Sequence, residues 1–319
     1  MNSIIFLLLG FILLFLGGEI LVRSSVSLAV RLKLSTLFIG MTVVSLATSA
    51  PELFVSLEAI FKGSSNIALG NAIGSNIANI TLVLGFTAVV FRVKISKETL
   101  TVNYPMMFLS SILLGVTLYF FDGIPVFAGY FFVALLILFT VFLTTVYRRG
   151  YLDFKNNNEY LDNTSDPLYK SLFLLILGVL LLKYGADFLV NATTDLAKDF
   201  GISDRIIAVT IVAIGTSIPE LATSIIAAFK KEDNLAIGNL IGSNMFNILA
   251  VLGITAAIKE IKIEDIAILS FDYFSMMLIT FIVGLFIYIF SKKQISRKEG
   301  SILLLIYFYY MYQNLLVVI

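Results

Sequence analysis

Two glutamates, Glu52 and Glu220, lie inside long apolar segments, and each directly follows a proline. The residues around them are nearly the same, because Thr-Ser-x-Pro-Glu-Leu occurs at 48–53 and again at 216–221. A charged side chain at the centre of a bilayer costs about 2.5–3.5 kcal/mol on insertion scales, so an intramembrane acid is a candidate functional group. Carboxylates and hydroxyls are hard oxygen ligands, and their pairing in both copies predicts a cation site.

The prolines add backbone oxygens to this site. Pro51 and Pro219 have no N–H group, and their rings clash with the carbonyls four residues earlier, at Ala47 and Gly215. The carbonyls freed in this way need partners at a depth that lipid-accessible water does not reach. Broken backbone is tolerated there only where it lines a cavity or is buried in protein. We therefore expect two interrupted helices whose acids meet halfway through the membrane.

Helical spacing places further polar side chains on the same faces, since residues three or four apart are neighbours on a helix. The first copy has the stripes Ser45, Ser49, Glu52 and Ser56 with Thr48 beside them, and Asn71, Ser75 and Asn79. The second copy has Ala213, Ser217, Glu220 and Ser224 with Thr216, and Asn239, Ser243 and Asn247. For Asn71, Asn76, Asn239 and Asn244, ligation of an ion and simple stapling of helices are equally open.

The oxygens that we expect to converge are two carboxylates, the freed carbonyls, and side chains of Thr48, Ser49, Thr216, Ser217, Ser75, Ser243, Asn79 and Asn247. Ca²⁺ accepts about six to eight oxygen ligands in flexible geometry, whereas Mg²⁺ keeps several waters. Two glutamates neutralise one Ca²⁺, and the same oxygens suit Na⁺ once Ca²⁺ has left. Competition of two ions for one site is what an antiporter requires.

The elements that position these residues are membrane helices. Of the 319 residues, 59% are hydrophobic and 13% are charged, against about 45–50% and about 25% in soluble domains. The sequence predicts an all-α polytopic membrane protein with ten transmembrane helices, near 3–22, 35–61, 66–90, 100–120, 125–147, 171–190, 205–229, 234–257, 268–290 and 301–318. A net charge of +1 indicates no nucleic-acid partner, and the absence of His and Cys restricts an ion site to oxygen ligands.

An internal repeat organises the chain, because each motif of the second half lies 168 residues after its counterpart, as with the glycine-rich motifs at 70–76 and 238–244. We expect residues 1–147 to form the first repeat, 148–170 a cytoplasmic linker and 171–319 the second repeat. Five spans per repeat, an odd number, make the two repeats inverted. Inverted repeats are typical of secondary transporters with a substrate site near the membrane midplane.

Basic residues predict the orientation. Most of those outside the apolar segments fall on the side that carries 148–170, which is therefore the cytoplasmic side, and both termini are expected to be extracytoplasmic. Glu19 and Asp187 are repeat counterparts near the ends of the first and sixth segments, where a gate and a helix-end contact are equally open interpretations. Lys183 lies inside a segment and is expected to snorkel to an interface.

The paired motifs resemble those of the sodium/calcium exchanger family. They are Ala47-Thr-Ser-Ala-Pro-Glu52 with Gly70 to Asn79, and Gly215-Thr-Ser-Ile-Pro-Glu220 with Gly238 to Asn247. The resemblance covers essentially the whole chain. It implies ten helices, an ion core formed by spans 2, 3, 7 and 8, and movement of spans 1 and 6 across that core. It also implies that no cofactor is needed and that the transport unit is a monomer.

The resemblance further implies the ligands of each ion. Ca²⁺ would be held by the carboxylates of Glu52 and Glu220 and the carbonyls of Thr48 and Thr216, and Na⁺ would use these with Ser49, Ser75, Ser217, Ser243 and the carbonyls of Ser45 and Ala213. Ala47 replaces the usual glycine. Asn247 stands where exchangers often have Asp, so both repeats carry Asn and the site has two formal negative charges, as in the bacterial inner-membrane branch.

These features predict a secondary antiporter that exchanges Na⁺ for Ca²⁺ across the cell (inner) membrane. The alternative is a Ca²⁺/H⁺ antiporter that uses the same carboxylates, and K⁺ dependence is open because of Asn79 and Asn247. A passive channel or a membrane scaffold is a third interpretation, which inverted repeats disfavour. An enzyme is not expected, since the sequence shows no nucleophile–base pair or phosphate-binding loop.

Overall fold

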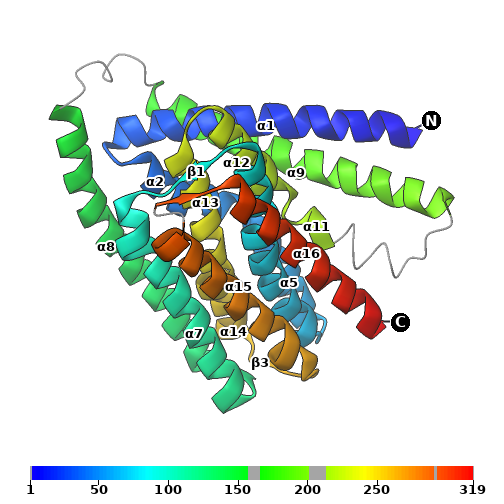
Figure 1. Cartoon of the computed structure of the whole chain (residues 1–319). Coiled ribbons are helices and arrows are strands. Elements are labelled where there is room, and N and C mark those ends of the chain that lie inside the picture. Colours follow the sequence, from blue (N-terminus) through cyan, green and yellow to red (C-terminus); the bar gives the residue numbers. More distant parts are fainter. Residues whose placement is uncertain (1, 157–165, 201–212, 291–292, 319) are drawn as a thin grey trace.

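The computed structural model describes residues 2–156, 166–200, 213–290 and 293–318. The beginning of the seventh expected span (205–212) and the middle of the expected linker (157–165) lie outside the described residues. The described residues are almost entirely helical, which agrees with the all-α prediction (Figure 1).

The helices follow one another with short connections. In chain order they are α1 (Asn2–Leu32), α2 (Thr36–Ile39), α3 (Ser45–Thr48), α4 (Ala50–Phe61), α5 (Ser65–Ala78), α6 (Gly85–Val90), α7 (Tyr104–Phe121), α8 (Val126–Asn156), α9 (Leu168–Asp199), α11 (Ala213–Gly215), α12 (Ile218–Phe229), α13 (Asp233–Phe246), α14 (Gly253–Ile258), α15 (Phe274–Leu285) and α16 (Arg297–Val318). Short π-helical segments join several of them, at Gly40–Val44, Asn79–Leu84, Thr99–Asn103, Asn247–Leu252, Ile268–Tyr273 and Phe286–Phe290.

Within the described residues, seven helices are long and apolar enough to cross a membrane, or eight if the bent pair Thr36–Thr48 and Ala50–Phe61 is one span. Their positions follow the apolar segments closely in the interior of each half, as at Ser65–Val90 and Asp233–Ile258. These two spans are also the most deeply buried. Other helices surround them with one apolar face turned outward, as expected where lipid replaces water.

Helix α1 is longer than the first apolar segment and contains Arg23 and Arg31, which the sequence had suggested lie beyond the helix. A charge near a helix end does not stop the helix when the same turns bury Leu28 and Ala29. The chain leaves the helix at Lys33, which adopts a left-handed conformation with φ of 56°. The amide of Leu34 then donates to the carbonyl of Ala29 (2.9 Å), a typical C-terminal closure.

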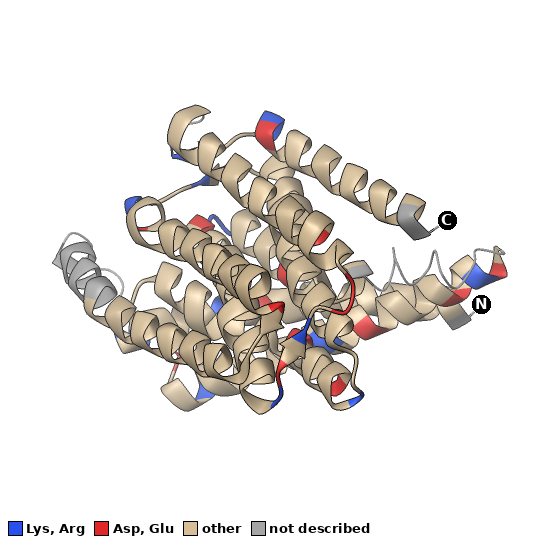
Figure 2. Cartoon of the chain, turned by 90° about the horizontal axis from the view of Figure 1, so that it is seen from below, with Lys and Arg blue, Asp and Glu red and all other residues tan. Residues whose placement is uncertain are grey.

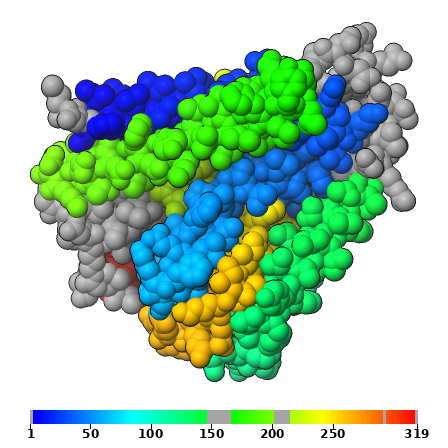
Figure 3. Space-filling model, turned by 180° about the vertical axis from the view of Figure 1, so that it is seen from behind, coloured from blue at the N-terminus to red at the C-terminus, as the bar shows by residue number. Residues whose placement is uncertain are grey.

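Helices α1 and α9 lie side by side across the remaining helices (Figures 1 and 3). Glycines allow their backbones to approach closely. A Cβ atom on Gly17 would lie 2.9 Å from the carbonyl oxygen of Gly178, and one on Gly185 would lie 3.0 Å from that of Gly10. Small residues at a crossing are a common basis of helix association in membranes. The two long helices therefore form one packed pair.

Two helix breaks interrupt the core at equivalent places. Ser49 separates α3 from α4 with φ −87° and ψ 4°, and Ser217 precedes α12 with φ −90° and ψ 0°. A proline occupies the first turn of each new helix, as the missing N–H group requires. The first break bends the span by 42°. The interruption predicted from Pro51 and Pro219 is thus present in both halves.

The two halves contact each other closely at a pair of glycines. A Cβ on Gly40 would lie 2.7 Å from the carbonyl oxygen of Leu235, and one on Gly238, which packs against Gly40, would lie 2.7 Å from that of Leu37. Four two-residue strands, which the sequence did not predict, also connect the halves. They are β1 (Val93–Lys94) paired with β4 (Gln294–Ile295), and β2 (Gly123–Ile124) paired with β3 (Ile261–Lys262).

Charged side chains are concentrated at helix ends and in connections, and long stretches of the helices carry none (Figure 2). Glu52 and Glu220 differ from these charged residues, because both are fully enclosed within the helical core. The fold therefore places two acids, each just after a helix break, in the most deeply buried part of the molecule.

Candidate functional site

Glu52 and Glu220 stand in the first turns of α4 and α12, directly after the two breaks. These residues are 1% and 0% exposed. A helix N-terminus carries partial positive charge, which favours a carboxylate at this position. The prolines that directly precede the two acids, Pro51 and Pro219, line the same cavity, so the starts of α4 and α12 lie close together. The structure thus brings together the two acids that the sequence singled out, from opposite halves of the chain.

Three of the four oxygens of the two carboxylates lack hydrogen-bond partners among the described residues. Oε2 of Glu52 and both Oε atoms of Glu220 are buried without a hydrogen-bond donor among the described residues. A buried carboxylate is costly unless hydrogen bonds or an opposite charge compensate it. A cation placed between the two side chains would supply that compensation. The free oxygens therefore indicate a cation site rather than a structural ion pair.

The hydroxyls of the two motifs fall into two groups. The Oγ atoms of Ser49 and Ser217 are buried and unpaired among the described residues, so they are free to act as ligands. Thr48 instead lies 3.2 Å from Oδ1 of Asn239 and 3.4 Å from Oγ of Ser243, and links the halves. Its side chain also lies next to the Glu220 carboxylate, although the two make no hydrogen bond with full geometry.

Ser45 holds the first broken span against the second half. Its hydroxyl oxygen lies 2.7 Å from the carbonyl oxygen of Gly40 and 2.9 Å from that of Asn239 and shares its one proton between them, so the side chain itself is engaged. This leaves the backbone carbonyl of Ser45, which the family resemblance implicates, as its candidate ligand. That carbonyl already accepts a hydrogen bond from the backbone amide of Ser49, at 2.9 Å, and lies 3.4 Å from Oγ1 of Thr48.

The asparagines that begin the π-helical segments face the core. Oδ1 of Asn79 and Oδ1 of Asn247 are buried acceptors without a donor among the described residues. The amide nitrogen of Asn247 donates to Oδ1 of Asn76 at 3.1 Å. Since π-helical turns often occur at functional sites, the two segments at 79–84 and 247–252 position these free acceptors at equivalent places.

The remaining candidate ligands differ from one another in how deeply they are buried. Ser75 and Ser243 are buried, 5% and 0% exposed, on α5 and α13. Thr216 is only half-buried at the second break, and Ala213 begins the short helix α11 directly after the undescribed residues. For Ala213 the family resemblance concerns the carbonyl alone.

For four asparagines, the sequence left open whether they bind an ion or only join neighbouring helices. Asn71 donates to the backbone carbonyl of Glu52 and to Oγ of Ser56, both at 3.0 Å. Asn76 donates to the carbonyl of Asn244 at 3.2 Å and so joins the halves. Each of these two side chains therefore joins two helices, as the second interpretation expects. The sequence showed that each glycine-rich motif repeats its asparagines. It could not show which group each asparagine would bind.

A cavity of about 230 Å³ reaches the site from one side of the core. It lies between α9 and the break before α4, and its lining includes Thr48, Pro51, Pro219, Leu180 and Lys183. Lys183 is exposed in the middle of α9, with Nζ 5.8 Å from the centre of the Tyr184 ring. The cavity borders the two helix breaks, at Thr48, Pro51 and Pro219, and its lining does not include Glu52 or Glu220.

The donor set consists of carboxylate, hydroxyl, amide and carbonyl oxygens, which suits Ca²⁺ or Na⁺ and not a thiolate- or imidazole-bound metal. Among the described residues, no cluster of three or more His, Cys, Asp or Glu side chains could hold a metal ion. The site therefore has few charges and many neutral oxygens. Such a site can bind a hard cation and release it again.

A family model described as "Sodium/calcium exchanger protein" matches residues 2–145 and 170–316, which is nearly the whole chain. The chain belongs to the sodium/calcium exchanger family. It is 38% identical over 97% of both chains to "Putative antiporter CaxA" of Alkalimonas amylolytica. It is 30% identical to "Sodium/calcium exchanger MaX1" of Methanosarcina acetivorans, with 96% of each chain covered.

Solved structures of the sodium-calcium exchanger NCX_Mj share the fold of this exchanger. One of them superposes with a TM-score of 0.79 at 30% identity and covers 97% of both chains. "Inner membrane protein YrbG" of Escherichia coli is also similar, at 36% identity over 88% of this chain and 86% of its own. The protein is thus a multi-pass membrane transporter of the cation/Ca²⁺ antiporter type, as its motifs had suggested.

Proposed function

We propose that this exchanger couples inward movement of Na⁺ to extrusion of Ca²⁺, and that both ions use in turn the site between Glu52 and Glu220. The observation that carries the proposal is the set of buried, unpartnered carboxylate oxygens at the starts of α4 and α12. Two negative charges match one Ca²⁺. The free hydroxyls of Ser49 and Ser217 add neutral oxygens that suit Na⁺.

In this proposal Ca²⁺ is held by the two carboxylates and by the carbonyls of Thr48 and Thr216. Na⁺ uses the same carboxylates with neutral oxygens of Ser49, Ser217, Ser75, Ser243, Asn79 and Asn247 and the carbonyls of Ser45 and Ala213. Because the sets overlap, the ions exclude each other. Each ion then stabilises a loaded state that can reorient, and exchange follows from competition.

Alternating access supplies the transport step. The equivalent breaks, the equivalent π-helical segments and the reciprocal strand pairs support two inverted five-helix repeats with ten spans in total. Helix α1 packs along α12 on one side of the site, whereas the cavity separates α9 from α4 on the other. This asymmetry is what one state of a rocking transporter shows. With cytoplasmic basic loops, the cavity faces outward and the termini are extracytoplasmic.

The coupling ion is tested in liposomes that contain the purified protein. Liposomes loaded with Na⁺ should accumulate labelled Ca²⁺ when diluted into Na⁺-free buffer, and dissipating the Na⁺ gradient should stop the uptake. Separate H⁺ and K⁺ gradients, with the voltage clamped, are the controls. Ca²⁺ uptake that ignores the Na⁺ gradient would refute Na⁺ coupling.

A Ca²⁺/H⁺ antiporter is the second candidate. It is favoured by the enclosure of Glu52 and Glu220 without a basic partner among the described residues, since such carboxyls can be carried as neutral acids. Asn79 and Asn247 also leave the site with only two acids. Uptake driven by a pH gradient in the absence of Na⁺ would select this function.

A further inference from the structure

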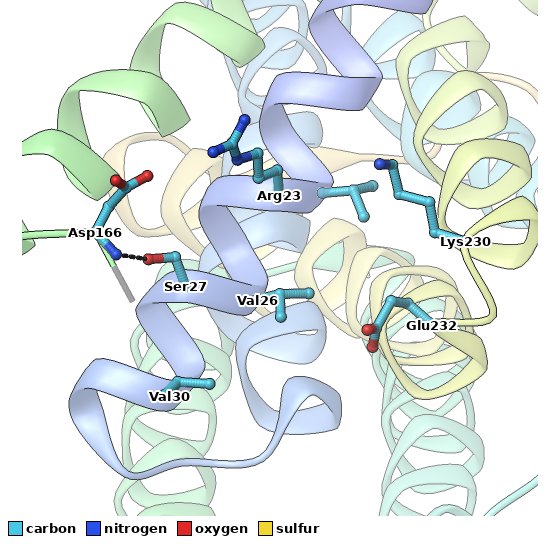
Figure 4. A pocket seen from close by; sticks show the side chains of 8 residues that line it. Arg23, Val26, Ser27, Val30, Asp166, Lys230 and Glu232 are labelled. Atoms are coloured by element: carbon cyan, nitrogen blue, oxygen red, sulfur yellow. Dashed lines mark hydrogen bonds between the residues drawn. The ribbon is translucent and has the colours of Figure 1, made fainter. Parts of the chain in front are cut away.

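An ion pair connects α1 to the core on the side where α1 packs along α12. Nζ of Lys230, the residue that follows α12, lies 2.5 Å from Oε1 of Glu19 in α1. The pair stands beside a cavity of about 380 Å³ whose lining includes Arg23, Ser27, Lys230 and Glu232 (Figure 4). Gly18 lies against Ile226 of α12 in the same region, so the pair fastens two packed helices.

The repeat gives this ion pair a counterpart. Asp187 lies 168 residues after Glu19, and Lys230 lies 168 residues after Lys62. Within the described chain, no ion pair joins Asp187 to Lys62. Lys62 instead binds Glu58 one turn earlier in α4, at 2.5 Å and with both side chains well exposed. On this side the cavity between α4 and α9 is open.

Each lysine also has a second acid close by. For Lys62 it is Glu58, which it binds in this structure. For Lys230 it is Glu232, two residues further on in the turn before α13 (Figure 4). Burial and the neighbouring Asp233 raise the pKa of Glu232, and the positive charge of Lys230 opposes that rise. A lysine released from the moving helix therefore keeps a local acid as partner.

We propose that Glu19–Lys230 and Asp187–Lys62 are alternate latches, of which one is closed in each of the two access states. The inference rests on the proposed alternating-access function. Glu19–Lys230 closes the α12 side while the α4 side is open, as in this structure. When α1 and α9 shift together, Glu19 releases Lys230 and Asp187 engages Lys62. These are positioning residues, since they lie at the ends of the path and touch no ion.

The latches are weak enough to be reversible. The side chains of Lys230 and Glu19 are 31% and 38% exposed, and an exposed ion pair contributes only about 1 kcal/mol or less. Loss of one latch should therefore shift the ratio of the two access states about two- to fivefold. If the ion pairs only stabilised the fold, loss of the pair on the α12 side and loss of the pair on the α4 side would not shift this ratio in opposite directions.

Accessibility measures this ratio directly, and the chain has no native cysteine. A single Leu180→Cys change places a thiol in the lining of the open cavity. Its rate of reaction with a membrane-impermeant maleimide should fall about two- to fivefold with Lys230→Gln and should rise with Lys62→Gln. Lys230→Arg and Lys62→Arg keep the charge and should leave the rate unchanged. The swap Glu19→Lys with Lys230→Glu should restore it.

Cross-linking provides a second measurement. Glu19→Cys with Lys230→Cys should form a disulfide that preserves labelling of the cavity, whereas Asp187→Cys with Lys62→Cys should form one that abolishes it. Reduction should restore the parent behaviour in both. Equal effects of Lys230→Gln and Lys62→Gln would overturn the proposal, as would a disulfide between the thiols introduced at positions 187 and 62 that leaves the cavity reactive. Because labelling needs no particular coupling ion, failure of Na⁺-driven uptake would be recognised separately.

Discussion

Glu52 and Glu220 occupy equivalent positions, yet their surroundings differ in detail. The backbone of Glu52 accepts from Asn71, whereas Asn239, the counterpart of Asn71, accepts from Thr48 of the other half. The asparagine of the first half therefore forms a hydrogen bond within its own half, whereas its counterpart in the second half forms one with the first half. At the residue scale, both oxygens of Glu220 and one of Glu52 remain buried without a donor among the described residues.

Neutralising either acid should abolish Ca²⁺ transport. Glu52→Gln or Glu220→Gln removes a charged ligand from a buried site, where loss of one partner of a buried charge pair costs about 2–5 kcal/mol. Ca²⁺ affinity measured by calorimetry should fall at least about 30-fold. Thermal unfolding should show an unchanged or raised Tm, because the variant no longer buries a carboxylate. Glu260→Gln, at an exposed acid, is the control, and retained flux in both site variants would contradict the assignment.

Lys183 should weaken cation binding from a distance. Its positive charge lines the same cavity as Thr48, so it repels a cation near the site, and dissolved salt screens that repulsion. Lys183→Gln should therefore raise the apparent Ca²⁺ affinity about two- to fivefold at low salt, with a smaller effect at high salt. Lys183→Arg should behave as the parent protein. A salt-independent change in uptake would mean that Lys183 acts through packing.

At the scale of elements, the contrast is between the bent core spans and the paired outer helices. The core spans are broken at Ser49 and Ser217, where helix ends point their dipoles at the site. Helices α1 and α9 are unbroken and are joined at glycines. A rigid pair that moves across a fixed core can change access on both sides at once, which a set of independent helices cannot do.

Separating α1 from α9 should slow transport and spare ion binding. A Cβ on Gly17 would lie 2.8 Å from the amide nitrogen of Leu182 and one on Gly178 would lie 2.9 Å from that of Leu21, so the helices must move apart. Gly17→Ala and Gly178→Ala should lower the Ca²⁺ uptake rate about tenfold, while calorimetric Ca²⁺ affinity changes less than about threefold. Leu16→Ala, on an outward face of α1, is the matched control.

At the scale of the molecule, the two halves are joined at the site, at the glycine crossings and at the strand pairs β1–β4 and β2–β3. Neither half completes the cation site alone, because Thr48 contacts Asn239 and Ser243 of the other half. The proposed cation site therefore requires both halves of the chain. In this structure α1 packs along α12, whereas a cavity lies between α4 and α9.

The orientation of the molecule can be tested with fusions. A phosphatase that is active only outside the cytoplasm should be active when fused after Ile319, because the basic loops are expected to remain inside. A fusion inserted between residues 157 and 165, in the expected cytoplasmic linker, should be inactive. The reverse pattern would place the cavity between α4 and α9 on the cytoplasmic side and would invert the proposed access state.

The membrane character and the family were predictable from the sequence, which also singled out the acids and hydroxyls of the candidate site. Helical spacing determines which side chains share a face, and a proline determines where a buried helix must break, so Glu52 and Glu220 could be found without coordinates. The repeat also predicted that each feature would occur twice. These properties depend on residues near one another along the chain.

Only the tertiary structure decided which of these oxygens are free. Ser45 and Ser49 belong to one predicted stripe, but Ser45 bonds to Asn239 across the halves while Ser49 has no partner among the described residues. Likewise Lys230 reaches Glu19 whereas Lys62 turns to Glu58. The reason is physical. A hydrogen bond or an ion pair between distant segments depends on how whole helices are placed against one another, and two copies of one pattern adopt different placements in a transporter that is open on one side.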